Sequence, residues 1–235
     1  MPAETRHHTS GSLQLAIGLA ASAGFVDAFV YERVAPVFVA NMSGNLVRLG
    51  IAAGAHRGHV TAASVVALVG FAAGVVVGSV HLDARVRKGL PADPSTLLAF
   101  EAALMVVLVV LLRLAHVTYS PSVEPIDYPA ILVGSTAMGL QAIALRRVGA
   151  VAVSTTYGTG AVVRLGEKLA LGARRSDRPS DHRRRVSVIV LASVLFSYVA
   201  GAFAAASLPA RPELLLIPVC VPLTGFVLLR NRTDD

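Results

Sequence analysis

The residues best suited to chemistry lie in two motifs near the start of the chain, Gly-Phe-Val-Asp-Ala at residues 24–28 and Asn-Met-Ser-Gly-Asn at residues 41–45. Asp27 stands inside an apolar run, and a charged side chain within a membrane span costs about 3 kcal/mol or more. Such a group usually faces the helix bundle or water. We therefore predict that Asp27 binds a proton or a cation, partnered by Arg48. The alternative is a carboxylate that water solvates at the membrane interface.

The second motif combines amide, hydroxyl and bare backbone groups, which suits a helix start or a re-entrant turn. Asn41 opens the motif, and Ser43 and Asn45 are predicted to cap a half-helix. The N-terminus of such a half-helix presents unpaired N–H groups to an anion or a polar solute. The alternative is an amphipathic helix on the membrane surface, with Arg48 reaching towards lipid headgroups.

The second half of the chain repeats this motif. At an offset of 116 positions, residues 41–50 align with residues 157–166, and a hydroxyl residue, Gly, Arg, Leu and Gly match in order. Tyr157, Thr159 and Arg164 are therefore predicted to form the corresponding site from the opposite face of the membrane. Chance similarity between two stretches rich in Ala, Val and Gly is the alternative.

Matching positions continue on either side of the repeated motif. Gly24 aligns with Gly139 at an offset of 115, and Gln141 lies close to the equivalent of Asp27. If both side chains line a cavity, one half of the chain binds charge and the other does not. Small residues spaced four apart also align, and they predict close helix packing within the bundle or between copies of the chain. They are Gly70, Gly74 and Gly78, matched by Ser197, Gly201 and Ala205.

The composition makes lipid the solvent for most of the chain. Hydrophobic residues fill 54% of the 235 positions and charged residues only 15%, against about 25% charged in a soluble domain. Six apolar runs approach or reach the roughly 20 residues that cross a bilayer, and each is predicted to be a helix. They are residues 13–31, 60–80, 96–112, 128–145, 186–208 and 214–229. Two further segments, 36–54 and 148–172, are broken by polar residues and are predicted not to span.

The basic residues between the runs orient the six helices. With six spans, 16 of the 21 Lys and Arg residues fall on the face that holds both termini and the loops 81–95 and 146–185. The positive-inside rule then predicts that this face is cytoplasmic, so that both termini of the multi-pass protein lie inside the cell. Counting the two broken segments as spans would move basic residues outside, which disfavours eight helices.

Two further interpretations concern single features of the spans. A cleavable signal peptide is disfavoured, because the first run continues to residue 31 without a polar cleavage region. Glu101 lies about one and a half turns into the third helix and is predicted to be a carboxylate near the cytoplasmic boundary.

Three spans per half is an odd number, so the two halves must insert with opposite orientations. The expected fold is all-α, with one membrane domain over residues 1–235 and two inverted three-helix repeats at about 12–115 and 127–230. A broken or re-entrant segment follows the first helix of each repeat. Inverted repeats are common in transporters and channels, whose sites form near the midplane at the repeat interface. We therefore expect a transporter or channel for a small solute or an ion.

Two other classes of function remain as alternatives. An intramembrane enzyme would need a base within reach of a nucleophile such as Ser43, but the seven His residues all fall in loops or at helix ends. We therefore expect no enzymatic activity. The other alternative is a non-transporting scaffold or partner subunit. The expected partners are the lipid bilayer, an unknown small solute or ion and a further copy of the chain. No cofactor, metal or nucleic acid is expected.

The two motifs at residues 24–28 and 38–45 give the sequence its most specific likeness. With them the chain resembles the YoaK-like family, bacterial membrane proteins of about this length with a domain of unknown function. The resemblance covers most of the chain, and outside the motifs it rests mainly on hydropathy and spacing. It implies an inner-membrane protein with about six helices, and it supplies neither a substrate nor a mechanism.

Overall fold

The computed structural model describes residues 3–115, 123–148, 158–172 and 180–231, and the regular elements within these ranges are all helical. They are α1 (Ala3–Arg33), α2 (Met42–Gly54), α3 (Gly58–Arg87), α4 (Ser95–Leu114), α5 (Asp127–Val148), α6 (Gly158–Gly172), α7 (Ser180–Ser207), the short 3-10 helix η1 (Pro212–Leu215) and α8 (Leu216–Asn231). Among the described residues, six stretches are long and apolar enough to cross a membrane. They lie in α1, α3, α4, α5, α7 and the continuous pair η1 and α8. The prediction of an all-α fold with six helices able to span a membrane is confirmed for the described residues.

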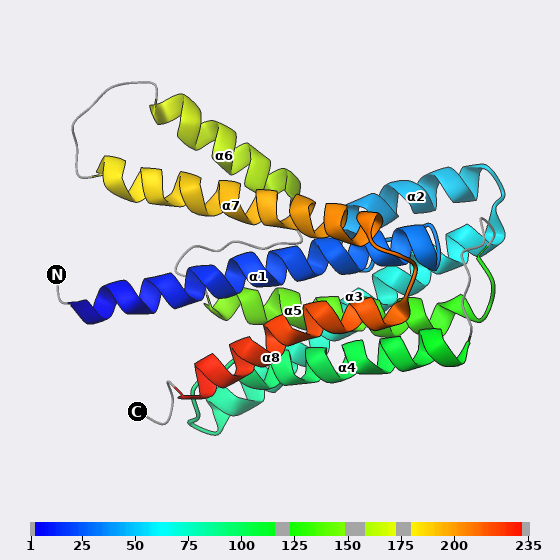
Figure 1. Cartoon of the computed structure of the whole chain (residues 1–235), viewed down its shortest axis with the longest axis horizontal. Helices are drawn as coiled ribbons and strands as arrows, with labels where there is room; N and C mark the ends of the chain where they lie inside the picture. Colours follow the sequence, from blue (N-terminus) through cyan, green and yellow to red (C-terminus); the bar gives the residue numbers. More distant parts are fainter. Residues whose placement is uncertain (1–2, 116–122, 149–157, 173–179, 232–235) are drawn as a thin grey trace.

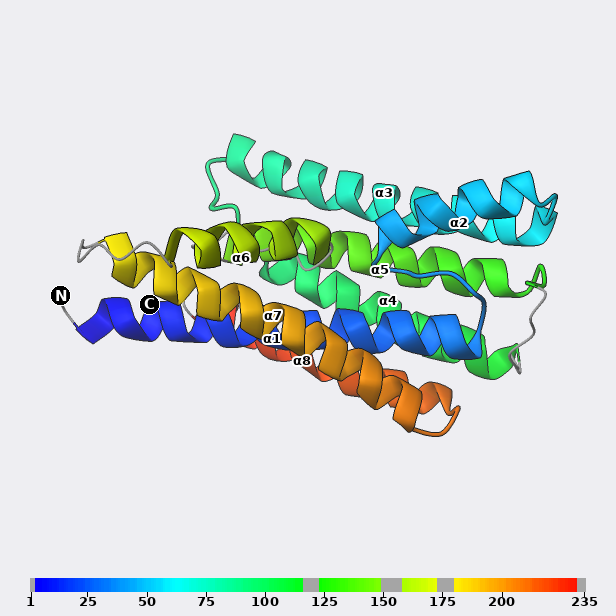
Figure 2. The ribbon, with the colours of Figure 1, turned by 90° about the horizontal axis from the view of Figure 1, so that it is seen from above.

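The long helices run roughly along one axis, and α1 starts at the same end of the bundle at which α8 finishes (Figure 1). The two shorter helices each cover only part of that length. α2 packs against α3 and α6 packs against α7. Both begin near the middle of the bundle and run outwards, α2 to the end where α1 finishes and α6 to the end where α1 starts (Figures 1 and 2).

The centre of the bundle consists of α1 and α5, which contact each other and are more deeply buried than the other spans. Around them lie α3, α4, α7 and α8, with α7 packed on α1, α3 on α5, and α4 between α5 and α8. Their outward faces carry large apolar side chains, such as Val76 on α3 and Phe196 and Phe203 on α7. An apolar exterior of this extent suits contact with lipid.

The glycines spaced four apart on α3 all face α5. A Cβ atom added at Gly74 would overlap the carbonyl oxygen of Thr136, and one at Gly70 would lie 2.8 Å from the carbonyl oxygen of Leu132. At Gly78 the added atom would make ordinary contact, at 3.4 Å, with side chains of α5. The absence of side chains at Gly70 and Gly74 therefore lets the two backbones touch.

The α1 and α7 pair shows the same close approach. A Cβ atom at Gly24 would overlap the carbonyl oxygen of Tyr198, and one at Gly201 would overlap the carbonyl oxygen of Ala21. Backbone atoms form the obstacle in both cases, so neither contact can relax by a side-chain rotation. The spacing of α1 and α7 thus depends on two glycines, one from each helix.

Replacing Gly24 by Ala is expected to push α1 and α7 apart and to lower the free energy of unfolding by about 1–3 kcal/mol, as overpacking does. The matched control is Gly50→Ala in α2, where open space surrounds the added methyl group. Thermal unfolding in detergent, followed by circular dichroism, should show a lower midpoint for Gly24→Ala alone. Equal midpoints for the two variants would contradict this packing.

Candidate functional site

Asp27 lies on α1 and anchors the connection between α1 and α2. Its side chain is only 2% exposed. One carboxylate oxygen accepts hydrogen bonds from the backbone N–H groups of Val39 and Ala40, each at 2.7 Å. The other accepts a hydrogen bond of 2.5 Å from the Tyr198 hydroxyl on α7. All three contacts come from donors, which suits an ionised carboxylate. Protein groups, rather than interfacial water, therefore solvate Asp27.

Asn45 holds the same connection from the other side. It is 0% exposed, its amide oxygen accepts a 2.9 Å hydrogen bond from the Phe38 N–H, and its amide nitrogen donates a 2.6 Å bond to the Phe38 carbonyl. Consecutive N–H groups of residues 38–40 are thus paired by side chains. Because an unpaired buried backbone group is costly, this pairing allows the non-helical segment to be buried within the helix bundle.

Asn41 caps the start of α2. Its amide oxygen accepts hydrogen bonds from the Gly44 N–H at 3.2 Å and from the Ser43 hydroxyl at 2.9 Å. This differs from the expectation that Ser43 and Asn45 cap the helix. Because α2 begins at Met42, only residue 41 stands at the capping position, and Asn45 lies one turn inside the helix.

Arg48 contacts Tyr31 and not Asp27. Its guanidinium donates a 3.1 Å hydrogen bond to the Tyr31 hydroxyl and lies 5.1 Å from the centre of that ring. The Tyr31 ring stacks in turn on Phe38, with 4.8 Å between ring centres. The predicted ion pair therefore does not form, because backbone amides and the Tyr198 hydroxyl already occupy the Asp27 oxygens.

In the second half of the chain the structure describes fewer of the predicted site residues. Gln141 of α5 is buried, and its amide nitrogen donates a 2.7 Å hydrogen bond to the Leu19 carbonyl on α1. Arg164 is exposed on α6. Tyr157 lies outside the described residues, and so does the side chain of Thr159. The structure therefore brings together the candidates of the first half, and it joins them to α7 through Tyr198.

Sequence reasoning missed one residue of this region. Tyr198 stands within an apolar run, 171 positions from its partner Asp27. A buried Tyr usually finds a hydrogen-bond partner for its hydroxyl, so its presence inside a span was a usable signal. Outside this region, Glu101 of α4, which was expected near the cytoplasmic boundary, is 0% exposed within the bundle.

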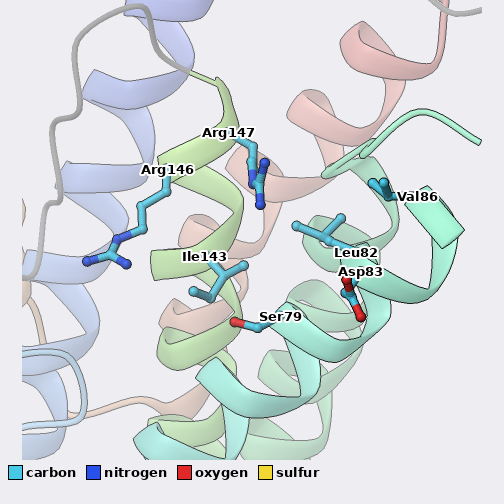
Figure 3. Close-up of a pocket in the computed structure, with 7 residues that line it drawn as sticks. All are labelled: Ser79, Leu82, Asp83, Val86, Ile143, Arg146 and Arg147. Atoms are coloured by element: carbon cyan, nitrogen blue, oxygen red, sulfur yellow. The ribbon is translucent and has the colours of Figure 1, made fainter.

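A separate pocket of about 360 Å³ opens where α3 and α5 end. Figure 3 shows two arginines at its edge, Arg146 and Arg147, which extend in different directions from the end of α5. The other polar side chains lining it are Ser79 and Asp83, and Asp83 forms a 2.8 Å ion pair with Arg87. None of the predicted site residues lines this pocket.

Removing the Tyr198 hydroxyl is expected to destabilise the protein, because one oxygen of a buried carboxylate then loses its donor. The Tyr198→Phe variant should lose about 1–3 kcal/mol of unfolding free energy, measured by titration with a denaturing detergent. Tyr128→Phe serves as the control, since among the described residues the Tyr128 hydroxyl has a hydrogen bond only with the exposed His59, at 3.3 Å. A Tyr198→Phe variant as stable as the control would contradict the anchoring role of Asp27.

The sequence comparisons agree with the helical architecture. The sequence profile of the family described as "Protein of unknown function (DUF1275)" matches residues 15–229. The chain is also similar to the "UPF0700 transmembrane protein YoaK" of Bacillus subtilis (strain 168), at 29% identity over 205 residues that cover 87% of this chain and 86% of that protein. No solved structure matches the chain. The predicted resemblance is confirmed, and because the profile spans nearly the whole helix bundle, the chain belongs to the DUF1275 family of proteins of unknown function.

Proposed function

We propose that the protein is a transporter or channel for a small polar solute or an ion in the bacterial inner membrane. One observation carries the proposal: two half-length helices, α2 and α6, begin near the middle of the bundle and run to opposite ends (Figures 1 and 2). Broken helices that start at the midplane are the usual way in which transporters built from inverted repeats form a substrate site. We infer that α2 and α6 are re-entrant and that the pathway passes their starting points.

The pattern of helix contacts supports an inverted repeat of α1–α4 and α5–α8. If α5 to α8 are the counterparts of α1 to α4, the contact of α1 with α7 should have its equivalent between α5 and α3. That contact is present. The contact of α2 with α3 likewise has its equivalent between α6 and α7, and the contact of α4 with α5 has its equivalent between α8 and α1. The remaining two contacts between spans are α1 with α5 and α4 with α8. Each joins a helix to its own counterpart, so exchanging the two halves leaves these contacts unchanged.

The glycine contacts follow the same relation at the level of single residues. Gly24 packs on the carbonyl oxygen of Tyr198, and its counterpart Gly139 packs on that of Phe71. Tyr198 and Phe71 are themselves 127 positions apart, which is also the separation of Gly201 from Gly74. Two helix crossings built from corresponding residues favour common ancestry of the halves over chance similarity.

The polar groups of the two halves differ. The offset of 115 that relates Gly24 to Gly139 relates Asp27 to Ala142, so the hydrogen-bonded pair of Asp27 and Tyr198 has two apolar counterparts, Ala142 and Phe71. The Asp27 carboxylate is engaged by three donors, whereas the N-terminal end of a helix carries partial positive charge. This combination favours an anion or a neutral polar solute over a cation.

The proposal includes orientation and excludes catalysis. The end of the bundle shared by the start of α1 and the end of α8 also holds the connection from α3 to α4, with its cluster of basic residues, and we assign it to the cytoplasm. We propose no enzymatic role, since the Ser43 hydroxyl donates its hydrogen bond to an amide oxygen, which is not a base.

The substitution Asn41→Asp tests the proposed pathway with little change in structure, because Asp and Asn cap helices about equally well. The added negative charge at the start of α2 is expected to slow anion flux at least several-fold. Flux is measured in proteoliposomes with a trapped halide-sensitive dye, and by light scattering for glycerol and urea. Gly58→Asp is the control, since it adds the same charge at the start of α3 in an exposed position surrounded by open space.

Two results would count against the proposal. Liposomes without protein-dependent flux of anions, cations or small neutral solutes would contradict transport and would favour the alternative of a membrane scaffold. Equal anion flux through Asn41→Asp and Gly58→Asp would contradict the location of the pathway.

A further inference from the structure

Glu101 is a buried carboxyl group without a hydrogen-bond partner. It lies on α4, is 0% exposed, and neither of its carboxyl oxygens has a partner among the described residues. An ionised carboxylate in such a place would pay the full cost of desolvation with no compensating contact. The group must therefore be neutral, and a neutral carboxyl group has a proton to donate.

The register of α4 against α5 supplies an acceptor for that proton. The two helices run antiparallel (Figure 1), and the Leu108 side chain packs 3.5 Å from the position that a Cβ atom would take at Gly134. Seven residues back along α4 lies Glu101, and seven residues forward along α5 lies Gln141. Seven residues are nearly two helical turns, so each step returns to the same face of its helix. This register therefore places Glu101 and Gln141 at about the same depth, on the faces that α4 and α5 turn towards each other.

Gln141 has an unused hydrogen-bond acceptor, which is what a protonated carboxyl group needs. Its amide nitrogen donates to the Leu19 carbonyl, which fixes the orientation of the amide. Its amide oxygen is buried and has no partner among the described residues. An unpaired acid and an unpaired amide oxygen on facing helices satisfy each other when the acid carries its proton.

The other helices around this position bring no compensating charge. The contacts of Gly18 with Val221, and of Gly225 with Leu15 and Leu98, bring α1 and α8 to the same level of the bundle. No charged side chain occurs in residues 13–26 of α1, 129–145 of α5 or 216–229 of α8, and Cys220, the one titratable group there, is exposed.

Titratable side chains do meet other parts of α4. His81 of α3 contacts α4 at Thr96 and at the Phe100 ring. Arg113, twelve positions after Glu101 along α4, forms a 2.6 Å ion pair with Glu213 of η1. Neither His81 nor Arg113 forms a hydrogen bond with the Glu101 carboxyl group, so a proton is the ion that neutralises it.

We propose that Glu101 is a proton-binding site of this protein, with Gln141 as the acceptor that holds the protonated carboxyl group. Binding adds one proton to one carboxylate oxygen, and release returns it to water when the bundle opens and the site hydrates. The site lies about 9 Å along α4 from its start at Ser95, at the rise of an α-helix, and hence in the half of the bundle nearer the basic loops. Its use to drive solute movement rests on the proposed transport function, whereas its existence does not.

Infrared difference spectroscopy on the protein in lipid vesicles tests the site directly. The wild type should show a carbonyl band of a protonated carboxylic acid, sensitive to exchange into deuterated water, which Glu101→Gln removes. Gln141→Leu should keep the band and shift it to higher frequency, because the acid then lacks its acceptor. The control Glu213→Gln changes an exposed ion-paired carboxylate and should leave the band as it is.

The experiments distinguish proton binding at Glu101 from the use of that proton to drive transport. Absence of a band that depends on Glu101, or a band that Gln141→Leu leaves unshifted, would overturn the proposal. The band could be present in vesicles that carry no flux, and the proton site would then stand while the transport function failed. Where flux is present, Glu101→Gln should abolish its acceleration by an imposed proton gradient, and flux that keeps this response would overturn the coupling role.

Discussion

A buried backbone N–H group without a hydrogen-bond partner costs several kcal/mol, and this constraint governs the connection between α1 and α2. The chain leaves α1, runs without helical hydrogen bonds through buried residues such as Val39 and Ala40, and starts a new helix at Met42. The Asp27 carboxylate and the Asn45 amide pair the N–H groups of residues 38–40. Without these side chains α2 would have no stable starting point within the bundle.

The packing of α1 against α7 depends on residues next to this connection. Gly24 and Gly201 let α1 and α7 touch, and Gly24 rests on the carbonyl oxygen of Tyr198. The side chain of that same Tyr198 then reaches Asp27, about one turn further along α1. A single residue of the second half therefore holds both the crossing of the two helices and the carboxylate that supports α2. In this way the polar connection is tied to the apolar contact surface between the halves.

Sequence could predict the six spans, because composition, run length and the distribution of basic residues act locally or over whole segments. It also identified the glycines on α3 and the polar start of α2, since both are patterns of neighbouring residues. It could not pair Asp27 with Tyr198, because that contact joins positions 171 apart and depends on how α1 crosses α7. Arg48, the partner expected for Asp27, is close to it along the chain but donates its hydrogen bond to the Tyr31 hydroxyl instead.

The burial of Glu101 was beyond reach of the sequence for a related reason. A residue six positions after a helix start can be exposed or deeply buried, depending on which helices pack against it. Here α1, α5 and α8 surround α4 at the level of Glu101. The capping of α2 shows the finer limit. The motif at residues 41–45 predicted a helix start, but the choice of Asn41 as the cap depended on the single residue at which the helix begins.

The most direct test of this account is the depth of the two ends of α2 in a bilayer, measured by accessibility of spin labels to oxygen and to a water-soluble nickel complex. Labels are placed singly at residues 43 and 54, which are both exposed, after replacement of Cys220 by Ser. A helix that starts at mid-depth predicts a label at residue 43 deeper than one at residue 54 by up to about 16 Å, at 1.5 Å per residue. Equal depths for the two labels would mean that α2 lies on the membrane surface and would contradict the account.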